Sequence, residues 1–295
     1  AAAKPERWVP LVTELLQQME TGGEIAFQDI PHVNGGLFRE INVLQLKVEE
    51  IAILAEAAKL DWSSVEPAIF GTLFERSLDP SSRAKLGAHY TGKPDILRVV
   101  EPVVMMPLRR RWETVRLEAE VLAERLTEAN GTAAKNTARA KLRDHIFAFR
   151  EELAAVRILD PACGSGNFLY VALERLLELD KEVTGFGAAN GLSGMLPVIG
   201  TGQLLGLEIN EYARELAQVV IWIGYLQWLI RNGYGYPDPV LSPLETIRLQ
   251  DALLDLTDPA HPKEAEWPAA DYIIGNPPFL GAQRLRRELG DTYTD

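Results

Sequence analysis

The segment Asn276-Pro277-Pro278-Phe279 combines groups that can hold and activate a planar amine. Its two prolines lack backbone donors and have fixed φ angles, so the loop that carries them is stiff. In such a loop the Asn276 side-chain oxygen and the Pro277 carbonyl can accept hydrogen bonds from an NH₂ group while Phe279 stacks on the attached ring. The lone pair of the amine nitrogen is then left free to attack. The alternative is a proline-rich turn without chemical function.

A second candidate is the glycine-rich segment Asp160-Pro161-Ala162-Cys163-Gly164-Ser165-Gly166-Asn167-Phe168. It follows a predicted strand and opens a predicted helix, and its two glycines let a ligand approach the backbone closely, as in nucleotide-binding turns. The dinucleotide fingerprint requires a third glycine at position 169, which is Leu, so a nicotinamide cofactor loses support. A tight turn without a ligand is the remaining alternative.

Two acidic residues follow further predicted strands. Glu208 ends the strand that comes next after the glycine turn, where a carboxylate can accept hydrogen bonds from ribose hydroxyls. A solvated glutamate is the plain alternative. Asp251 follows a third strand and could bind the exocyclic amine of an adenine ring, although a helix N-cap explains it nearly as well.

The elements that must position these residues form an α/β pattern after about residue 155. Short apolar runs alternate with helices, which predicts a parallel sheet whose carboxyl edge brings the motifs together. The expected strands are 156–160, 204–208, 246–250 and 272–275, and the expected helices are 166–182 and 211–231. Residues 184–202, rich in Gly, are expected to form a flexible insertion.

The first half of the chain is predicted to be mostly helical. Helix-period apolar positions occur in 43–54 and 65–78, and Gln28 to Phe38 is expected to form a loop or hairpin. Residues 111–141 are charged and rich in Ala, so we expect a long, partly exposed helical hairpin that breaks near Asn130-Gly131. We therefore divide the chain into a helical region, 1–150, and an α/β domain, 151–295.

Composition limits the functional classes. One cysteine and four histidines without paired metal-ligand spacing argue against a disulfide framework and against a metal site. The N-terminus lacks a signal-peptide core and no apolar run could cross a bilayer, so we expect a cytoplasmic protein. The net charge of −12 argues against non-specific DNA binding, and the arginine groups 109–111 and 284–287 are either phosphate contacts or solvated helix faces.

With these motifs in order, the sequence resembles class I S-adenosylmethionine-dependent N6-adenine DNA methyltransferases in the gamma arrangement, which implies a Rossmann-like sheet. The motifs run from Gly87-Ala88-His89-Tyr90-Thr91 through the glycine turn and the two acidic residues to Asn276. In that family the first of them lies over the methionine end of the cofactor, a role we carry to Tyr90 and Thr91. The resemblance implies the following cofactor-binding residues: Ala88, His89, Tyr90, Thr91, Asp160, Pro161, Ala162, Cys163, Gly164, Gly166, Asn167, Phe168, Glu208, Ile209, Asp251 and Ala252.

The implied reaction is transfer of a methyl group from S-adenosylmethionine to N6 of an adenine flipped out of double-stranded DNA, with Asn276, Pro277, Pro278 and Phe279 as catalytic residues. Segments 34–38 and 70–76 also resemble the large methyltransferases of type IIL restriction-modification and phage-exclusion systems of bacteria and archaea. The family has further strands and a target-recognition domain after this loop, so we expect the catalytic domain to be incomplete here and any nuclease to lie elsewhere.

Other functions fit the same motifs. Loops of this kind also serve methylation of RNA adenine and of protein glutamine, because each substrate presents a planar conjugated nitrogen. Phe279 in place of Tyr, together with the long helical region before the glycine turn, favours DNA. A noncatalytic methyltransferase-like module that binds DNA or partner subunits is the alternative from another class.

Overall fold

The computed structural model describes residues 4–30, 32, 41–60, 65–69, 71, 91–234, 244–255, 257–258, 261–278 and 286. The most N-terminal elements are a 3₁₀ turn (Pro5–Arg7), helix α1 (Trp8–Thr21), a β1–β2 hairpin and helix α2 (Val48–Ala57). In the hairpin, β1 (Gly23–Ile25) pairs antiparallel with β2 (Gln28–Ile30). Ala26 and Phe27 make the turn with φ angles of 50° and 62°.

Two expectations for this region are corrected by the structure. The helical pattern predicted from Val43 becomes a helix only at Val48, because the Glu50 carboxylate accepts a hydrogen bond from the Lys47 backbone N–H at 2.8 Å and caps the first turn there. The turn of the hairpin also precedes the segment predicted to contain it, since Gln28–Ile30 is already its second strand. Residues 33–38 and 72–78 lie outside the described residues.

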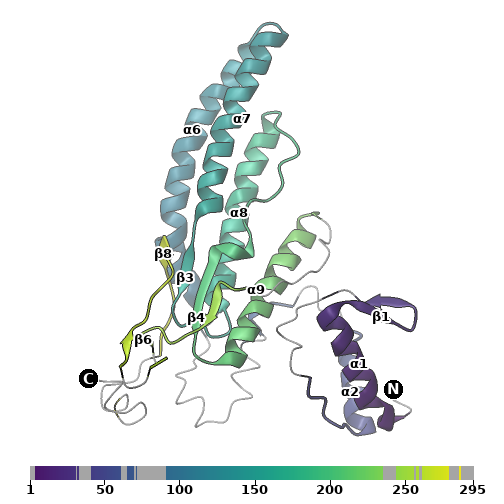
Figure 1. Cartoon of the computed structure of the whole chain (residues 1–295). Coiled ribbons are helices and arrows are strands. Elements are labelled where there is room, and N and C mark those ends of the chain that lie inside the picture. The colour runs from purple at the N-terminus through teal and green to yellow at the C-terminus, as the bar shows by residue number, and fades with distance from the viewer. Residues whose placement is uncertain are drawn as a thin grey trace.

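The predicted helical hairpin is confirmed. Helix α5 (Lys93–Val100) continues through a π-helical turn (Glu101–Met105) into α6 (Met106–Glu128), and α7 (Thr132–Ala155) returns beside it. Gly131, with a φ of 85°, lies between the two long helices, which project together from the rest of the molecule (Figure 1). Because α7 spans residues 132–155, it crosses the division that we expected at residue 150.

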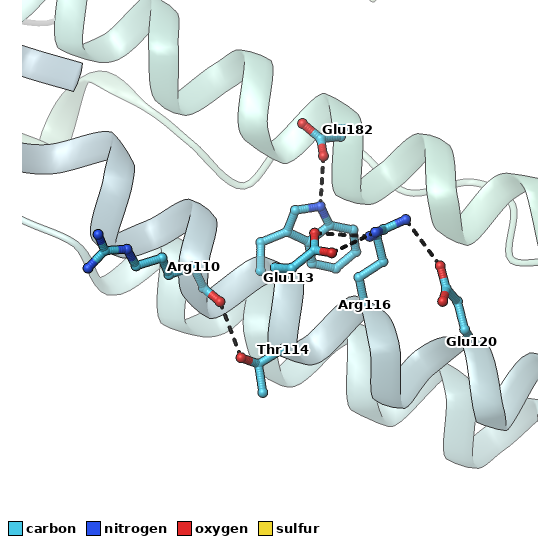
Figure 2. Close-up of polar contacts among 7 residues, drawn as sticks. Arg110, Glu113, Thr114, Arg116, Glu120 and Glu182 are labelled. Carbon is cyan, nitrogen blue, oxygen red and sulfur yellow. Dashed lines mark hydrogen bonds and ion pairs between the residues drawn. The ribbon is translucent and has the colours of Figure 1, made fainter. Parts of the chain in front are cut away.

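The base of this hairpin packs on α8 (Asn167–Ala189) through a buried tryptophan. The Trp112 ring stacks on Phe149 of α7 at a centroid distance of 5.4 Å and meets Phe186 of α8 edge-on at 5.7 Å. Its indole N–H donates to Glu182 at 2.9 Å, a contact drawn in Figure 2. Arg109 also pairs with Glu182, so aromatic packing and ion pairs together join the hairpin to the α/β unit.

Four parallel strands form the sheet in the order β5-β4-β3-β8. They are β3 (Ile158–Asp160), β4 (Leu204–Glu208), β5 (Ile247–Leu249) and β8 (Tyr272–Ile273). All four match the strands expected from the sequence, and the Rossmann-like parallel arrangement is as predicted. The glycine-turn strand β3 is central, with β4 on one side and β8 on the other.

Alternation along the strands distributes side chains to the two faces of the sheet. Ile158, Leu204 and Ile274 join the large core formed with α5–α9, in which α9 (Glu211–Arg231) has the bounds expected from the sequence. Leu159, Leu205 and Leu207 form a smaller cluster on the other face, where Ala252 and Ala270 pack against them. After β5 the chain makes a short antiparallel pair, β6 (Leu254–Asp255) with β7 (Lys263–Glu264).

The expected flexible insertion at 184–202 is partly wrong. Its first six residues belong to α8, and the chain after them is tied to a buried ion pair between Arg150 and Asp180 at 2.9 Å. Asp180 accepts from the Val198 backbone N–H at 2.9 Å, and Arg150 donates to the Leu196 carbonyl. A second 3₁₀ turn (Thr201–Gln203) then leads into β4. None of the described helices combines the length and the hydropathy needed to span a membrane.

Candidate functional site

The glycine turn lies at the carboxyl end of the central strand and is held there by backbone hydrogen bonds. The Cys163 N–H donates to the Leu207 carbonyl of β4 at 3.1 Å, and the Gly166 N–H donates back to the Cys163 carbonyl at 2.8 Å. Gly166 has a φ of 79°, and a Cβ there would lie 3.0 Å from that of Ala217 on α9. Gly164 has a φ of 53°, and among the described residues no atom beyond its chain neighbours lies within 4 Å of the place where its Cβ would be, so the described part of the chain leaves open space beside the turn.

Asp160 ends the central strand as a buried carboxylic acid with an exposed fraction of 1%. Its Oδ1 accepts a hydrogen bond from the Ala162 N–H at 3.0 Å. The pKa of Asp160 is raised to about 7, chiefly by burial and also by the neighbouring Glu208 carboxylate, against the lowering effect of the hydrogen bond from the Ala162 N–H. The turn therefore contains an acid that changes charge near neutral pH.

Glu208 ends β4 and faces the same turn. Its Oε2 accepts from the Gly164 N–H at 2.8 Å, and its Oε1 accepts from the Asn210 N–H at 2.9 Å. Burial raises the pKa of Glu208, while these backbone donors lower it. The predicted proximity of this carboxylate to the glycine turn is confirmed, because the two are joined by a hydrogen bond.

The remaining acidic candidate has a local structural task. Asp251 Oδ1 accepts from the backbone N–H groups of Leu253 at 2.7 Å and Leu254 at 3.2 Å, which stabilises the turn after β5. No helix begins at this aspartate in the described part of the chain, so the N-cap alternative is wrong. Ala252 is half-buried against the smaller core cluster, and Ile209 is exposed at the sheet edge beside Glu208.

The amide-bearing loop emerges from β8, immediately beside the glycine turn. Gly275 packs so closely against Asp160 that a Cβ at this position would lie 2.4 Å from Asp160 Oδ1. Asn276 follows with an exposed side chain, and its Nδ2 donates to the Thr91 hydroxyl at 3.2 Å, across 185 positions of sequence. Pro277 and Pro278 are exposed as well. Three separate segments therefore meet at one edge of the sheet.

The other predicted site residues differ in where they lie. Cys163 and Phe168 are buried in the main core, and burial raises the pKa of the Cys163 thiol far above its usual range. Pro161 and Ala162 are half-buried in the turn. Ala88, His89, Tyr90 and Phe279 lie outside the described residues. Of the arginines weighed as phosphate contacts, Arg109 and Arg111 pair with glutamates across the helices, as solvated helix faces do.

The buried polar atoms of the turn fit the cofactor that the resemblance implies. Asn167 has an exposed fraction of 7%, and its Oδ1 has no hydrogen-bond partner in the part of the chain that the structure describes. A buried amide oxygen without a partner is costly unless a ligand supplies a donor. This acceptor, the two carboxylates and the open space at Gly164 suit a ligand that carries hydroxyl and ammonium donors, as S-adenosylmethionine does.

Two glycines were missed by the sequence analysis. Gly275 allows the amide loop to touch Asp160, and Gly71 packs on the glycine turn so closely that a Cβ there would lie 2.1 Å from Ser165 Oγ. Gly275 carried a usable signal, because a glycine at the end of an apolar strand indicates a close backbone approach. Gly71 lies within a predicted helix, where a single glycine has no comparable meaning.

Comparison with known proteins supports this geometry. A family model described as the DNA-methyltransferase domain of MmeI matches residues 132–291. Among solved structures, the type IIL restriction-modification enzyme MmeI in complex with DNA is similar with a TM-score of 0.69 and 26% identity. That match covers 94% of this chain and 36% of the MmeI chain.

Curated relatives give the same picture. DNA methyltransferase A of Bacillus subtilis (strain 168) is 27% identical over 275 residues, which are 88% of this chain and 28% of the relative. A candidate type II restriction enzyme and methyltransferase of Methanocaldococcus jannaschii is 29% identical over 265 residues, 79% of this chain and 22% of the relative. The chain thus spans less than a third of the length of either curated relative.

Proposed function

The chain belongs to the MmeI DNA-methyltransferase domain family, and from this premise we propose that it transfers a methyl group from S-adenosylmethionine to the N6 amine of adenine in DNA. The proposal concerns the chemistry of the sheet edge. We further propose that the protein acts in a restriction-modification or phage-defence system in the cytoplasm of a bacterium or archaeon. Relatives described as restriction enzymes support this setting.

One observation carries the proposal: the amide loop and the glycine turn leave adjacent strands and touch. Ile158 and Leu159 of β3 are in register with Tyr272 and Ile273 of β8, and Gly275 continues this approach up to Asp160. A methyl donor held at the turn would therefore lie beside an amine held at Asn276. Such proximity converts an encounter between two molecules into a step within one complex.

The residues of the turn would hold the donor. The Glu208 carboxylate and the Asn167 amide oxygen accept hydrogen bonds from its hydroxyl and ammonium groups, while the open space at Gly164 admits its body. Two carboxyl groups in a buried setting also favour a positively charged ligand. When bound, S-adenosylmethionine supplies an electrophilic methyl group on a sulfonium centre.

The amide loop would hold the acceptor. Asn276 Oδ1 and the Pro277 carbonyl accept the two amine hydrogens, and Phe279 stacks on the base. As the nitrogen attacks, its hydrogens become more acidic, so these hydrogen bonds strengthen in the transition state. The two prolines keep the loop stiff while this happens. We also propose the division expected from the sequence, with residues 1–150 as a helical region that carries the cofactor motif at 87–91 and residues 151–295 as the S-adenosylmethionine-binding catalytic part, although α7 continues across this boundary.

An assay of the full-length protein tests the function. Tritium transfer from labelled S-adenosylmethionine to DNA should fall by more than about 100-fold in Asn276→Ala, because oriented hydrogen bonds to the reacting group are lost. Calorimetric binding of the cofactor should be retained. Asn136→Ala, at an exposed position of α7, is the matched control and should behave as wild type.

The product identifies the substrate. Single-molecule sequencing of DNA from cells expressing the protein should detect N6-methyladenine at a defined site. Near-normal transfer by Asn276→Ala would contradict the assignment of the loop. Tritium found in RNA or in protein glutamine, and absent from DNA, would replace the proposed substrate, and cofactor-independent DNA binding without any transfer would indicate a noncatalytic module.

A further inference from the structure

Gly71 occupies a helical position at which glycine is unfavourable. It belongs to residues 65–69 and 71, which we call the Gly71 segment, and it is buried and helical. Glycine stabilises a helix less than alanine does, because its backbone loses more freedom on folding. A buried helical glycine therefore indicates a neighbour that leaves no room for a side chain. At Gly71 this neighbour is the glycine turn of the sheet.

Two side chains of the turn fill the place where a Cβ of residue 71 would be. That Cβ would lie 2.1 Å from Ser165 Oγ, 2.9 Å from Ser165 Cβ and 3.2 Å from Asn167 Nδ2. The Ser165 hydroxyl can rotate away, but the Ser165 Cβ is fixed to the backbone of the turn. Any side chain at position 71 would therefore push the Gly71 segment and the glycine turn apart.

The Gly71 segment is itself held in place by the two helices that cover the sheet. The Val65 carbonyl accepts a hydrogen bond from Gln227 Nε2 of α9 at 2.9 Å. The Glu66 carboxylate accepts a hydrogen bond from the hydroxyl of Tyr170 on α8, whose side chain is buried. The segment is thus a fixed support for the turn and not a loose connection.

The turn is confined from two other directions as well. Cys163 is bonded to the backbone of β4, and Gly166 packs against Ala217 of α9. The Gly71 segment closes a third side, the one that carries the side chains of Ser165 and Asn167. Contacts from three elements leave the backbone of the turn little freedom to move.

The position of Asn167 matters for the proposed cofactor. This residue opens α8 and is 7% exposed, and its side-chain oxygen has no hydrogen-bond partner among the described residues. A group that binds a ligand must be held in its productive geometry by its own neighbours. Gly71 is such a neighbour, because the Asn167 amide lies against it.

We propose that Gly71 is a positioning residue of the cofactor site, where its missing side chain lets the Gly71 segment rest on Ser165 and Asn167 and fix them for binding S-adenosylmethionine. This inference rests on the proposed function and deepens it. It adds a support from the helical N-terminal region to a glycine turn that is otherwise held by β4 and α9.

A substitution in the full-length protein tests the close approach. Gly71→Ala should raise the dissociation constant for S-adenosylmethionine, measured by calorimetry, by more than about tenfold, because Asn167 is displaced from its ligand-binding position. The matched control is Gly185→Ala. Gly185 is also a helical glycine, but no described atom outside its own stretch of α8 lies within 4 Å of the added Cβ. This control should bind the cofactor as wild type does.

A second substitution in the turn should relieve the first. Ser165→Gly removes both Ser165 atoms that a Cβ at position 71 would meet and leaves only Asn167 Nδ2 at 3.2 Å. In the Ser165→Gly background, Gly71→Ala should therefore raise the dissociation constant by less than about threefold. If Gly71 acted only through the stability of its own helix, the loss would be the same in both backgrounds.

Several results would overturn the inference. One is cofactor binding by Gly71→Ala within about twofold of wild type, and another is an equal loss of affinity with and without Ser165→Gly. If Gly71→Ala does not fold, the Gly71→Ala/Ser165→Gly protein must still fold and bind the cofactor within about threefold of Ser165→Gly, and its failure would also overturn the inference. Failure of the wild-type protein to bind S-adenosylmethionine would instead overturn the proposed function itself, so the two failures are distinguishable.

Discussion

Polar groups are buried both at the carboxyl edge of the sheet and at the base of the helical hairpin. The two regions differ in whether these groups have partners of opposite charge. At the hairpin base Arg150 and Asp180 pair with each other and also bind backbone groups. At the sheet edge Asp160 and Glu208 are two acids side by side, and the Asn167 oxygen has no partner among the described residues. Paired charges stabilise a fold, while acids and amides placed together without a cation are suited to a ligand.

Breaking the buried ion pair between Arg150 and Asp180 should produce the largest change, a loss of stability. Asp180→Asn leaves the Arg150 guanidinium buried beside a neutral group, so the free energy of unfolding should fall by about 3–5 kcal/mol. Chemical denaturation measures this. Cofactor affinity of the folded protein should not change, since Asp180 lies away from the turn. The control is Asp144→Asn, which alters an exposed pair with Arg143. A loss as small as that of the control would contradict the structural role of the buried pair.

At the sheet edge the largest effect should be on activity. Gly275→Ala places a methyl group 2.4 Å from Asp160 Oδ1, so the amide loop must move away from the turn. Such a displacement should reduce methyl transfer by about 100-fold, as misplacement of about 1 Å does elsewhere. Gly202→Ala is the matched control, because no described residue beyond its chain neighbours lies within 4 Å of the added atom. Equal rates for the two variants would mean that the loop tolerates the displacement.

The buried acid should give stability a pH dependence opposite to that of ion-paired carboxylates. Because the pKa of Asp160 is about 7 in the fold and near its ordinary value when unfolded, its stabilising contribution is present at acid pH and is lost as the pH rises towards 7. Between about pH 4.5 and 6.5, Asp160→Asn should make the slope of unfolding free energy with pH more positive by up to about 1.4 kcal/mol per unit. Identical slopes in the two proteins would show that Asp160 is ionised throughout.

The smallest effect is expected on the exposed side of α6. Arg116 pairs with Glu113 at 2.7 Å and with Glu120 at 3.1 Å, as Figure 2 shows. Glu113 is exposed, and the side chains of Arg116 and Glu120 remain partly open to solvent, so water and salt screen these pairs. Arg116→Ala should lower the melting temperature slightly at low salt and leave it unchanged in 1 M salt. A drop like that of Asp180→Asn would remove the distinction between exposed and buried pairs.

Local patterns predicted much of the α/β unit. The strand at 204–208 and the helix at 211–231 have the predicted bounds, because the strand is a short continuous apolar run that is buried and the helix buries residues at a spacing of three to four. Glycines misled the prediction for α8. Gly187 suggests a loop, yet it lies within α8, and the end of the Met195 side chain packs where its Cβ would be. A glycine required by a neighbouring segment has the same sequence signature as a glycine required by a turn.

Contacts between residues far apart in the chain could not be predicted from the sequence. The pairs Arg150–Asp180 and Thr91–Asn276 join positions 30 and 185 residues apart, and no spacing rule connects them. The edge on which Asp160, Glu208 and Asn276 meet was predictable, since parallel strands bring their carboxyl ends together. Contacts such as Gly275 against Asp160 require the register of β3 with β8, which a single sequence does not contain.

The pairing of β3 with β8 also determines when the site can form during synthesis of the chain. The Arg157 N–H donates to the Asp271 carboxylate at 2.7 Å, a link 114 positions long, whereas the α6–α7 hairpin closes over a few residues. Local contacts form early and distant strand pairing forms late. A ribosome-bound chain would thus have its hairpin folded and its glycine turn waiting until β8 emerges. Of the described strands of this sheet, β8 leaves the ribosome after β3, β4 and β5 and inserts beside β3, and only then does the nascent chain gain its Asn276 loop.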